Sequence, residues 1–209
     1  MNVPARIRSG SAAALAALLL VSGGCARQVT RVAPEQAVDL SGRWNDVDSR
    51  LVADEIIRQS FDASAGPSWA AGYARENGGR APTVIVGAIR NRSMEHIPVG
   101  TFVKDLERAY LRSGMVQVVA SAEDRREVRD ERFDQQEFAS ADTRARLGRE
   151  RGADYMLQGD IESVQDREGR RSVVFYQVDV TLVDLETNQK TWVGQHKIKK
   201  YVQRPLVRW

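Results

Sequence analysis

The sequence lacks the residue combinations from which most catalytic and metal sites are built. Its only cysteine is Cys25, so neither a disulfide within the chain nor a cysteine-based zinc cluster can form. The two histidines, His96 and His196, fall in different predicted elements, whereas metal ligands cluster. No Gly-rich phosphate loop opens a helix, and no Gly-x-Ser-x-Gly motif is present. We therefore expect a protein that is not an enzyme and that needs no metal or other cofactor.

No apolar stretch is long enough to cross a membrane. The longest run, at residues 12–21, is about half of the roughly 20 residues that a bilayer span needs. It follows Arg6 and Arg8 and ends in Ser22-Gly23-Gly24, directly before Cys25, which is typical of a secretory signal peptide. This segment resembles a bacterial lipoprotein signal, in which the cysteine is lipidated and becomes the mature N-terminus. Ordinary secretion with an unmodified cysteine is the alternative.

Processing at Cys25 would divide the chain into three parts. We expect residues 1–24 to be removed as a lipoprotein signal peptide, residues 25–41 to form the lipidated cysteine and a short tether, and residues 42–209 to form a single globular domain. In the lipoprotein pattern, the residue after the cysteine influences sorting. Ala26 is not the aspartate associated with retention in the inner membrane. The resemblance therefore implies a lipid anchor in the outer membrane.

The sequence has no large excess of charge of either sign. It contains 31 Lys and Arg residues and 28 Asp and Glu residues, a net charge of +3. Residues 1–24 hold two of the arginines and no acidic residue, so their removal would leave a net charge of +1. Nucleic-acid binding proteins usually carry a strong basic excess, and we expect no nucleic-acid partner here.

The central strand is predicted at residues 83–89, which are almost all apolar. A strand with one wet face should alternate, so this strand should be covered on both faces. Pro82 can begin a strand, and the polar Arg90-Asn91-Arg92-Ser93 ends it. A helix at residues 100–112 and a short buried strand at 115–119 follow. This order predicts a parallel strand–helix–strand unit.

The remaining elements are predicted from apolar spacing and from helix-ending residues. Helices are expected at residues 46–61, 69–76, 123–138 and 142–151. The third of them is dense in charges of both signs and has only Val128, Phe133 and Phe138 to face a core, so we expect a solvated, salt-bridged helix. Residues 155–164, 172–184 and 191–201 alternate like strands, with a turn in which Asn188 can take a left-handed conformation. The predicted fold class is α+β: a mixed sheet of about five strands, with a strand–helix–strand start, a C-terminal antiparallel meander and helices packed on it.

Four stretches of the sequence resemble one known family. They are residues 38–46 with 48–49, 82–87 with 91–97, 152–159, and 184–187 with Trp192. The most specific of them is Asn91-Arg92-Ser93-Met94-Glu95-His96-Ile97. Together they resemble the LpoB-like lipoproteins, which activate bifunctional penicillin-binding proteins. The Gly152-Ala153-Asp154-Tyr155 stretch is shared more widely, including with CsgG-like secretion lipoproteins and with the TolB N-terminal domain type, to which the fold is expected to be similar.

The resemblance implies a location and a partner. It predicts an outer-membrane lipoprotein that faces the periplasm, binds a bifunctional penicillin-binding protein anchored in the inner membrane, and stimulates glycan polymerisation and crosslinking. Well-known members carry a long proline-rich tether, whereas the tether here is short. Two alternatives stay open: a CsgG-like secretion-associated lipoprotein, for which no alternating strand pair is left over, and a periplasmic ligand-sensing domain.

The candidate partner-binding residues are mainly arginines. Arginine is enriched at interface hot spots because its planar guanidinium pairs with carboxylates while its stem packs against neighbouring groups. We expect the contact at the last predicted helix, and otherwise at the end of the central strand and at Tyr176. A merely solvated surface is the alternative. The candidates are Arg144, Arg149 and Arg151 on that helix, Arg90 and Arg92 at the strand end, and Tyr176.

Overall fold

The computed structural model describes residues 29–34, 36–64 and 66–204. The predicted signal peptide and Cys25 lie outside these residues. Contacts divide the chain into two units, residues 1–36 and residues 37–209. In the first unit, the described residues form neither helix nor strand. All of the helices and strands described below belong to the second unit.

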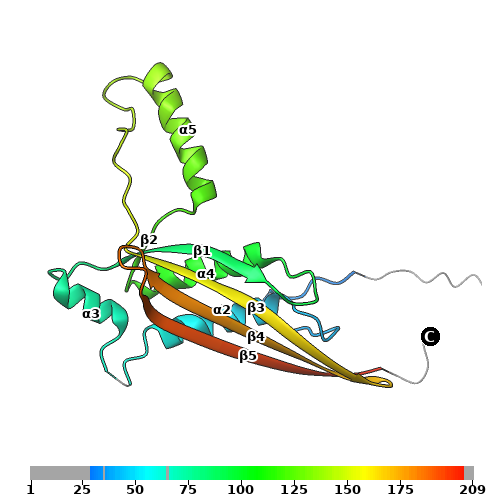
Figure 1. The fold of residues 1–209 in the computed structure, drawn as a ribbon. Helices are drawn as coiled ribbons and strands as arrows, with labels where there is room; N and C mark the ends of the chain where they lie inside the picture. The colour runs from blue at the N-terminus through cyan, green and yellow to red at the C-terminus, as the bar shows by residue number, and fades with distance from the viewer. Residues whose placement is uncertain (1–28, 35, 65, 205–209) are drawn as a thin grey trace, which may run out of the picture. The chain divides into compact units, whose positions relative to one another are not determined.

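The described residues of the second unit form one mixed five-stranded sheet and four helices (Figure 1). The sheet order is β2-β1-β3-β4-β5, in which β1 runs parallel to both β2 and β3, and β3, β4 and β5 pair antiparallel. The predicted α+β class and the meander are therefore confirmed. The helices are α2 (Asp46–Ser60), α3 (Trp69–Glu76), α4 (Val99–Ser113) and α5 (Ala122–Phe138), and the strands are β1 (Thr83–Asn91), β2 (Gln117–Val118), β3 (Tyr155–Glu168), β4 (Arg171–Asp184) and β5 (Lys190–Gln203).

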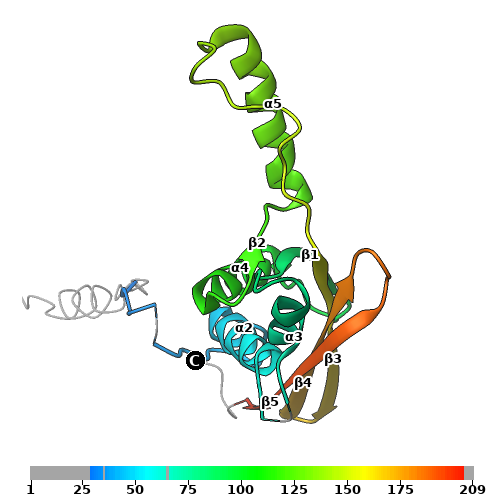
Figure 2. The same cartoon turned by 90° about the vertical axis from the view of Figure 1, so that its left-hand side faces the viewer.

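The core lies between one face of the sheet and helices α2 and α4. Strand β4 buries alternate side chains from Ser172 to Leu182, as its period of two predicts. Val52 and Ile56 of α2 and Phe102 of α4 are fully buried in the same cluster. Figure 2 shows both helices on the same side of the sheet. One face of the meander is thus covered by helices, and the fold has two layers.

The central strand is buried on both faces only in its first half. Thr83 to Val86 are buried, but Ala88 is exposed and lies within a register irregularity between Val86 and Ile89. Ile85 pairs with Met156 and lies outside the cluster that contains Val86. The strand predicted at residues 115–119 is also shorter than expected. Strand β2 contains only Gln117 and Val118, and neither residue is buried.

The prediction of a helix at residues 142–151 was wrong. This segment forms turns and irregular structure. Its only large apolar side chain, Leu147, is exposed, so a helix here would have no core face to bury. Gly148 has a φ of 68°, which interrupts a right-handed helix, and the Ser140 and Thr143 side chains bond to each other.

Helix α5 forms as predicted, but none of its residues is buried. Its only candidate core residues, Val128, Phe133 and Phe138, are exposed, at 44%, 62% and 79%, so α5 is the solvated helix that its mixed charges favour. The helix is stabilised locally instead. The Ser121 hydroxyl accepts the Asp124 N–H as an N-cap, and Gln135 bonds to Glu131 one turn earlier.

Candidate partner-binding surface

Residues 91–97 form a turn that is held by its own side chains. The Asn91 amide donates to the Glu95 carbonyl oxygen at 2.7 Å, and its Oδ1 accepts the Ser93 N–H at 2.9 Å and the Ser93 hydroxyl at 2.6 Å. Ser93 Oγ in turn accepts the Glu95 N–H. An Asn side chain commonly satisfies backbone groups two residues ahead in this way. The turn therefore has a fixed shape before any partner binds.

The two faces of this turn differ. Asn91, Ser93 and Glu95 are partly buried and Ile97 is buried, whereas the alternate residues between them are exposed. The exposed side chains are Arg92, Met94 and His96. We call these three residues the exposed face of the turn.

Glu95 anchors the turn to the core. Its Oε1 accepts the Tyr176 O–H at 2.8 Å, and its Oε2 accepts the Trp44 N–H at 3.2 Å. The Trp44 ring packs edge-on against Tyr176 and Phe102. Burial raises the pKa of Tyr176 well above its usual range, and the neighbouring Glu95 carboxylate raises it further. The phenol therefore stays protonated and donates to Glu95.

The structure places Tyr176 in the core and not on the surface. Its side chain is fully buried, so it can act on a partner only through the turn that it supports. The sequence reasoning identified Trp44 as a packing residue, but it missed the inward-facing role of Glu95. The residue types from Asn91 to Ile97 do not alternate between polar and apolar, so the sequence carried no signal for an inward-facing carboxylate.

Arg90 and Arg92 converge on one carboxylate. Arg90 Nε lies 2.9 Å and Arg92 Nε 2.7 Å from Asp160 Oδ1, and Asp160 is the β3 residue paired with Arg90. Burial alone would raise the pKa of Asp160, but the two guanidinium groups outweigh it and hold the pKa below its ordinary value. Both arginines are 57% exposed, so they are accessible but already paired.

The other three candidate arginines lie in the segment that follows α5. Arg144 and Arg149 are exposed, and their guanidinium groups make no ion pair or hydrogen bond with any residue that the structure describes. The Arg151 guanidinium contacts the Gln117 side chain. Glu150, which lies between Arg149 and Arg151 in the sequence, forms ion pairs with Arg129 and Arg132 of α5. These ion pairs attach the segment to the helix (Figure 1). The candidates thus fall into two groups, one at the turn and one in this segment.

Nothing in the described part of the chain suggests a metal site or a membrane span. Residues 29–34, 36–64 and 66–204 contain no group of three or more His, Cys, Asp or Glu side chains that could hold a metal ion. In the same residues, no helix combines the length and the apolar character that crossing a bilayer requires.

Comparison with known proteins identifies the family. A family model described as the peptidoglycan-synthase activator LpoB matches residues 48–198. The chain belongs to the LpoB family. The family match contains both groups of candidate arginines and the whole turn from Asn91 to Ile97. The resemblance predicted from the sequence is therefore confirmed at the level of the LpoB family.

Several solved structures are similar to this chain, at low identity. The LpoB C-terminal domain from Salmonella enterica is 16% identical over 75% of this chain and 99% of that chain, with a TM-score of 0.37. The LpoB C-terminal domain from Escherichia coli is 13% identical over 71% and 98%, with a TM-score of 0.39. Lipoprotein GNA1162 from Neisseria meningitidis is 23% identical over 57% and 83%, with a TM-score of 0.36. Among curated proteins, no sequence matches this chain significantly.

Proposed function

We propose that this LpoB-family chain is an outer-membrane lipoprotein that binds and stimulates a bifunctional penicillin-binding protein from the periplasmic side. Its role is regulatory, and the synthase carries out the polymerisation and crosslinking chemistry. The observation that carries the proposal is the match of the peptidoglycan-synthase activator family over residues 48–198. The lipoprotein-like sequence at residues 6–25 supports the membrane anchor.

The turn at residues 91–97 supports a protein-binding role. Its internal hydrogen bonds and the Glu95 anchor fix its conformation, so little conformational entropy is lost when a partner binds. Arginine and methionine are enriched at protein interfaces, and the exposed face of the turn presents one of each. A rigid turn with these exposed groups is suited to protein recognition.

Arg144 and Arg149 remain the proposed primary contact. Both carry a full charge, and neither is used by the described fold. Replacing them should therefore leave the stability of the domain unchanged, because surface substitutions away from specific contacts rarely exceed about 0.5 kcal/mol. This property makes them a clean test of partner binding.

A lipid II polymerisation assay with the cognate bifunctional synthase tests the proposal. The purified protein should increase the rate of glycan polymerisation, and the double variant Arg144→Glu with Arg149→Glu should abolish this increase without a change in melting temperature. The matched control is Arg170→Glu with Arg171→Glu at the β3–β4 hairpin. Those arginines are also exposed and form no ion pair within the described residues. The control should stimulate like the wild type.

Two results would count against parts of this proposal. Full stimulation by the folded Arg144/Arg149 variant would remove that segment as the contact and move the search to Arg90, Arg92 and the rest of the turn. Failure of the wild-type protein to bind or stimulate its cognate synthase would reject the function itself.

A further inference from the structure

The meander strands are longer than the helices that cover them. Strands of 14 residues such as β3 and β4 span about 46 Å, whereas the 15-residue helices α2 and α4 span about 22 Å. Roughly half of the helix-facing side of the meander is therefore left without a covering helix. The far half of each strand must either bury apolar groups elsewhere or present polar groups to solvent.

The residue types on this face change where the helices end. The inward-facing positions of β3 begin with Leu157 and Ile161 and continue as Ser163, Gln165 and Arg167. The two acidic neighbours of Arg167 in the sequence alternate to the opposite face of the strand, so they do not neutralise it there. On β3, the far half of this face is thus polar and carries one positive charge.

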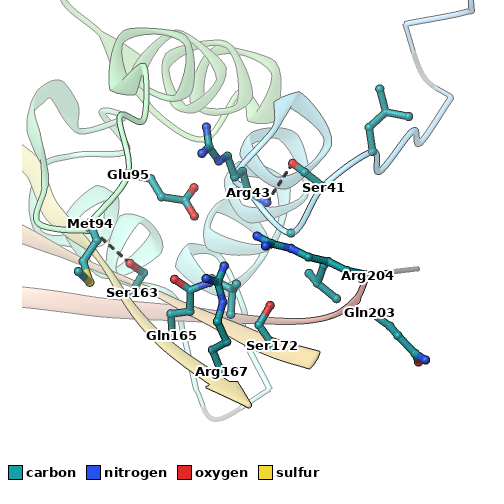
Figure 3. A pocket seen from close by; sticks show the side chains of 14 residues that line it. Ser41, Arg43, Met94, Glu95, Ser163, Gln165, Arg167, Ser172, Gln203 and Arg204 are labelled. Carbon is teal, nitrogen blue, oxygen red and sulfur yellow. Dashed lines mark hydrogen bonds between the residues drawn. The ribbon is translucent and has the colours of Figure 1, made fainter. Parts of the chain in front are cut away.

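A cavity of about 550 Å³ lies on this part of the face (Figure 3). It is lined by residues 40–43 before α2, by the turn residues Met94 and Glu95, and by the far ends of β3, β4 and β5. Its volume is in the range of small-molecule sites, which is about 300–1,000 Å³. Three separate parts of the chain therefore meet around one space.

Three arginines from different segments line this cavity. They are Arg43 before α2, Arg167 on β3 and Arg204 after β5. Their guanidinium groups make no ion pair or hydrogen bond with the residues that the structure describes. Figure 3 shows the side chains of Arg167 and Arg204 pointing toward one another. Like charges gathered in one cavity repel each other, and an anion between them would relieve this repulsion.

The acidic residue in the lining, Glu95, can offset at most one of the three arginine charges. Glu95 already accepts hydrogen bonds from Tyr176 and from the Trp44 backbone. The lining also supplies hydroxyl groups from Ser41, Ser163 and Ser172. The cavity therefore offers several donors and net positive charge, and a ligand for it needs several acceptor oxygens and negative charge.

We propose that this cavity binds a phosphate group. A phosphoryl group has more acceptor oxygens than a carboxylate and can carry two negative charges, so it can bond guanidinium groups from separate segments of the chain at the same time. The site goes beyond synthase activation, because it uses none of the arginines assigned to the partner contact. The phosphate can come from a soluble metabolite or from a lipid headgroup, and both sources share this chemistry.

Calorimetric titration of the purified protein with inorganic diphosphate at constant ionic strength tests the site. The wild type should show saturable binding with a stoichiometry near one. Arg167→Gln with Arg204→Gln should weaken binding about tenfold or more, because charge-assisted hydrogen bonds are lost. Arg43→Gln alone should also weaken it and provides a second variant if the first is poorly folded. Arg170→Gln with Arg171→Gln removes the same charge from the neighbouring hairpin and should bind like the wild type.

Three outcomes would overturn the proposal: no saturable binding of diphosphate, equal weakening by the hairpin control, or binding of succinate as tight as that of diphosphate. A flotation assay separates the two sources. Selective capture of the wild type by phosphatidylglycerol vesicles over phosphatidylcholine vesicles, lost in the Arg167/Arg204 variant and displaced by diphosphate, assigns a lipid headgroup. Binding of diphosphate without vesicle capture assigns a soluble ligand.

Discussion

Glu95 shows how one inward-facing carboxylate can fix an exposed turn. Its two oxygens bond to Tyr176 and to the Trp44 backbone, which belong to β4 and to the segment before α2. The turn, the sheet and the start of the domain therefore share one hydrogen-bonded group. Glu95 is partly buried and also lines the cavity, but the Tyr176 hydroxyl comes from a fully buried side chain packed against Trp44, so its bond is poorly replaced by water.

The variant Tyr176→Phe tests this anchor. It removes the hydroxyl and leaves a carboxylate oxygen without its donor, which should lower the free energy of unfolding by about 1–3 kcal/mol. Tyr201→Phe removes the same hydroxyl from an exposed tyrosine and should change stability by less than about 0.5 kcal/mol. Urea denaturation measures both values. Equal stability of the wild type and Tyr176→Phe would show that the anchor contributes little.

The buried Tyr110 makes the free energy of unfolding depend on pH in the alkaline range. Burial raises the pKa of Tyr110 to about 12, while its hydrogen bond with Ser60 opposes this slightly. The pKa of an unfolded tyrosine is about 10, so the folded state keeps its proton to higher pH. The resulting stability is fully present below pH 10 and is lost as the pH rises toward 12. The loss amounts to about 3 kcal/mol.

Tyr110→Phe has no proton to lose at this position and provides the comparison. Between pH 9 and pH 11.5, the free energy of unfolding of the wild type should fall relative to that of the variant. Tyr155 and Tyr176 titrate in both proteins and cancel in the difference. Denaturation at the two pH values measures it, and a pH-independent difference would contradict the assignment.

At the level of elements, β5 is an edge strand that is partly protected by a helix side chain. The Gln59 amide donates to the Gln195 carbonyl oxygen at 3.1 Å and accepts the Gln195 N–H at 3.2 Å. The backbone N–H and C=O of Gln195 are thereby hydrogen-bonded by Gln59, as they would be by a neighbouring strand. Exposed edges favour unwanted strand pairing, and this contact together with the β5 lysines opposes it.

Gln59→Ala should release this part of the edge. The Gln195 amide should exchange its hydrogen with solvent about fivefold faster, because a net hydrogen bond is worth about 1 kcal/mol. Gln195→Ala is the control, since it keeps the backbone groups that contact Gln59 and should retain the protection. Hydrogen exchange followed by NMR resolves the single amide, and unchanged protection in Gln59→Ala would contradict the role of the helix.

Elements with strong apolar periodicity could be predicted, and those without it could not. Strand β4 alternates over its whole length, and the structure follows that alternation. Residues 142–151 have suitable cap residues but only Leu147 to bury, so local signals predicted a helix that has nothing to pack against. The phosphate cavity could not be predicted, because Arg43, Arg167 and Arg204 are distant in sequence and meet only through the sheet.

At the scale of the whole molecule, an ion-pair network fixes where the chain enters the domain. Lys200 of β5 lies 2.6 Å from Asp48 in α2 and 2.9 Å from Asp39 before it. Burial alone would lower the pKa of Lys200, but its bonds to both carboxylates outweigh this and raise it. The position of Asp39 relative to the sheet is therefore set by a charged contact. Any N-terminal anchor acts on the domain through this point.

The proposed anchor limits how far the domain can reach from the membrane. If the contact between Asp39 and Lys200 is released, the roughly 20 residues between Cys25 and α2 span at most about 70 Å when fully extended. This limit applies only if Cys25 is lipidated, and the lipidation of Cys25 can be tested directly. Replacing this cysteine removes the thiol to which the lipid would be attached.

Cys25→Ala should therefore leave the protein uncleaved or release it into the periplasm, whereas the wild type should fractionate with the outer membrane. Ala26→Asp is the matched control, because it keeps the cysteine and introduces the residue that the lipoprotein pattern associates with inner-membrane retention. This control should keep the lipid mass and move to the inner membrane. Membrane fractionation with mass spectrometry of the N-terminus measures both properties. Recovery of Cys25→Ala in the outer membrane with an unchanged mass would show that the chain is held there by other means, and the 70 Å limit on its reach would no longer apply.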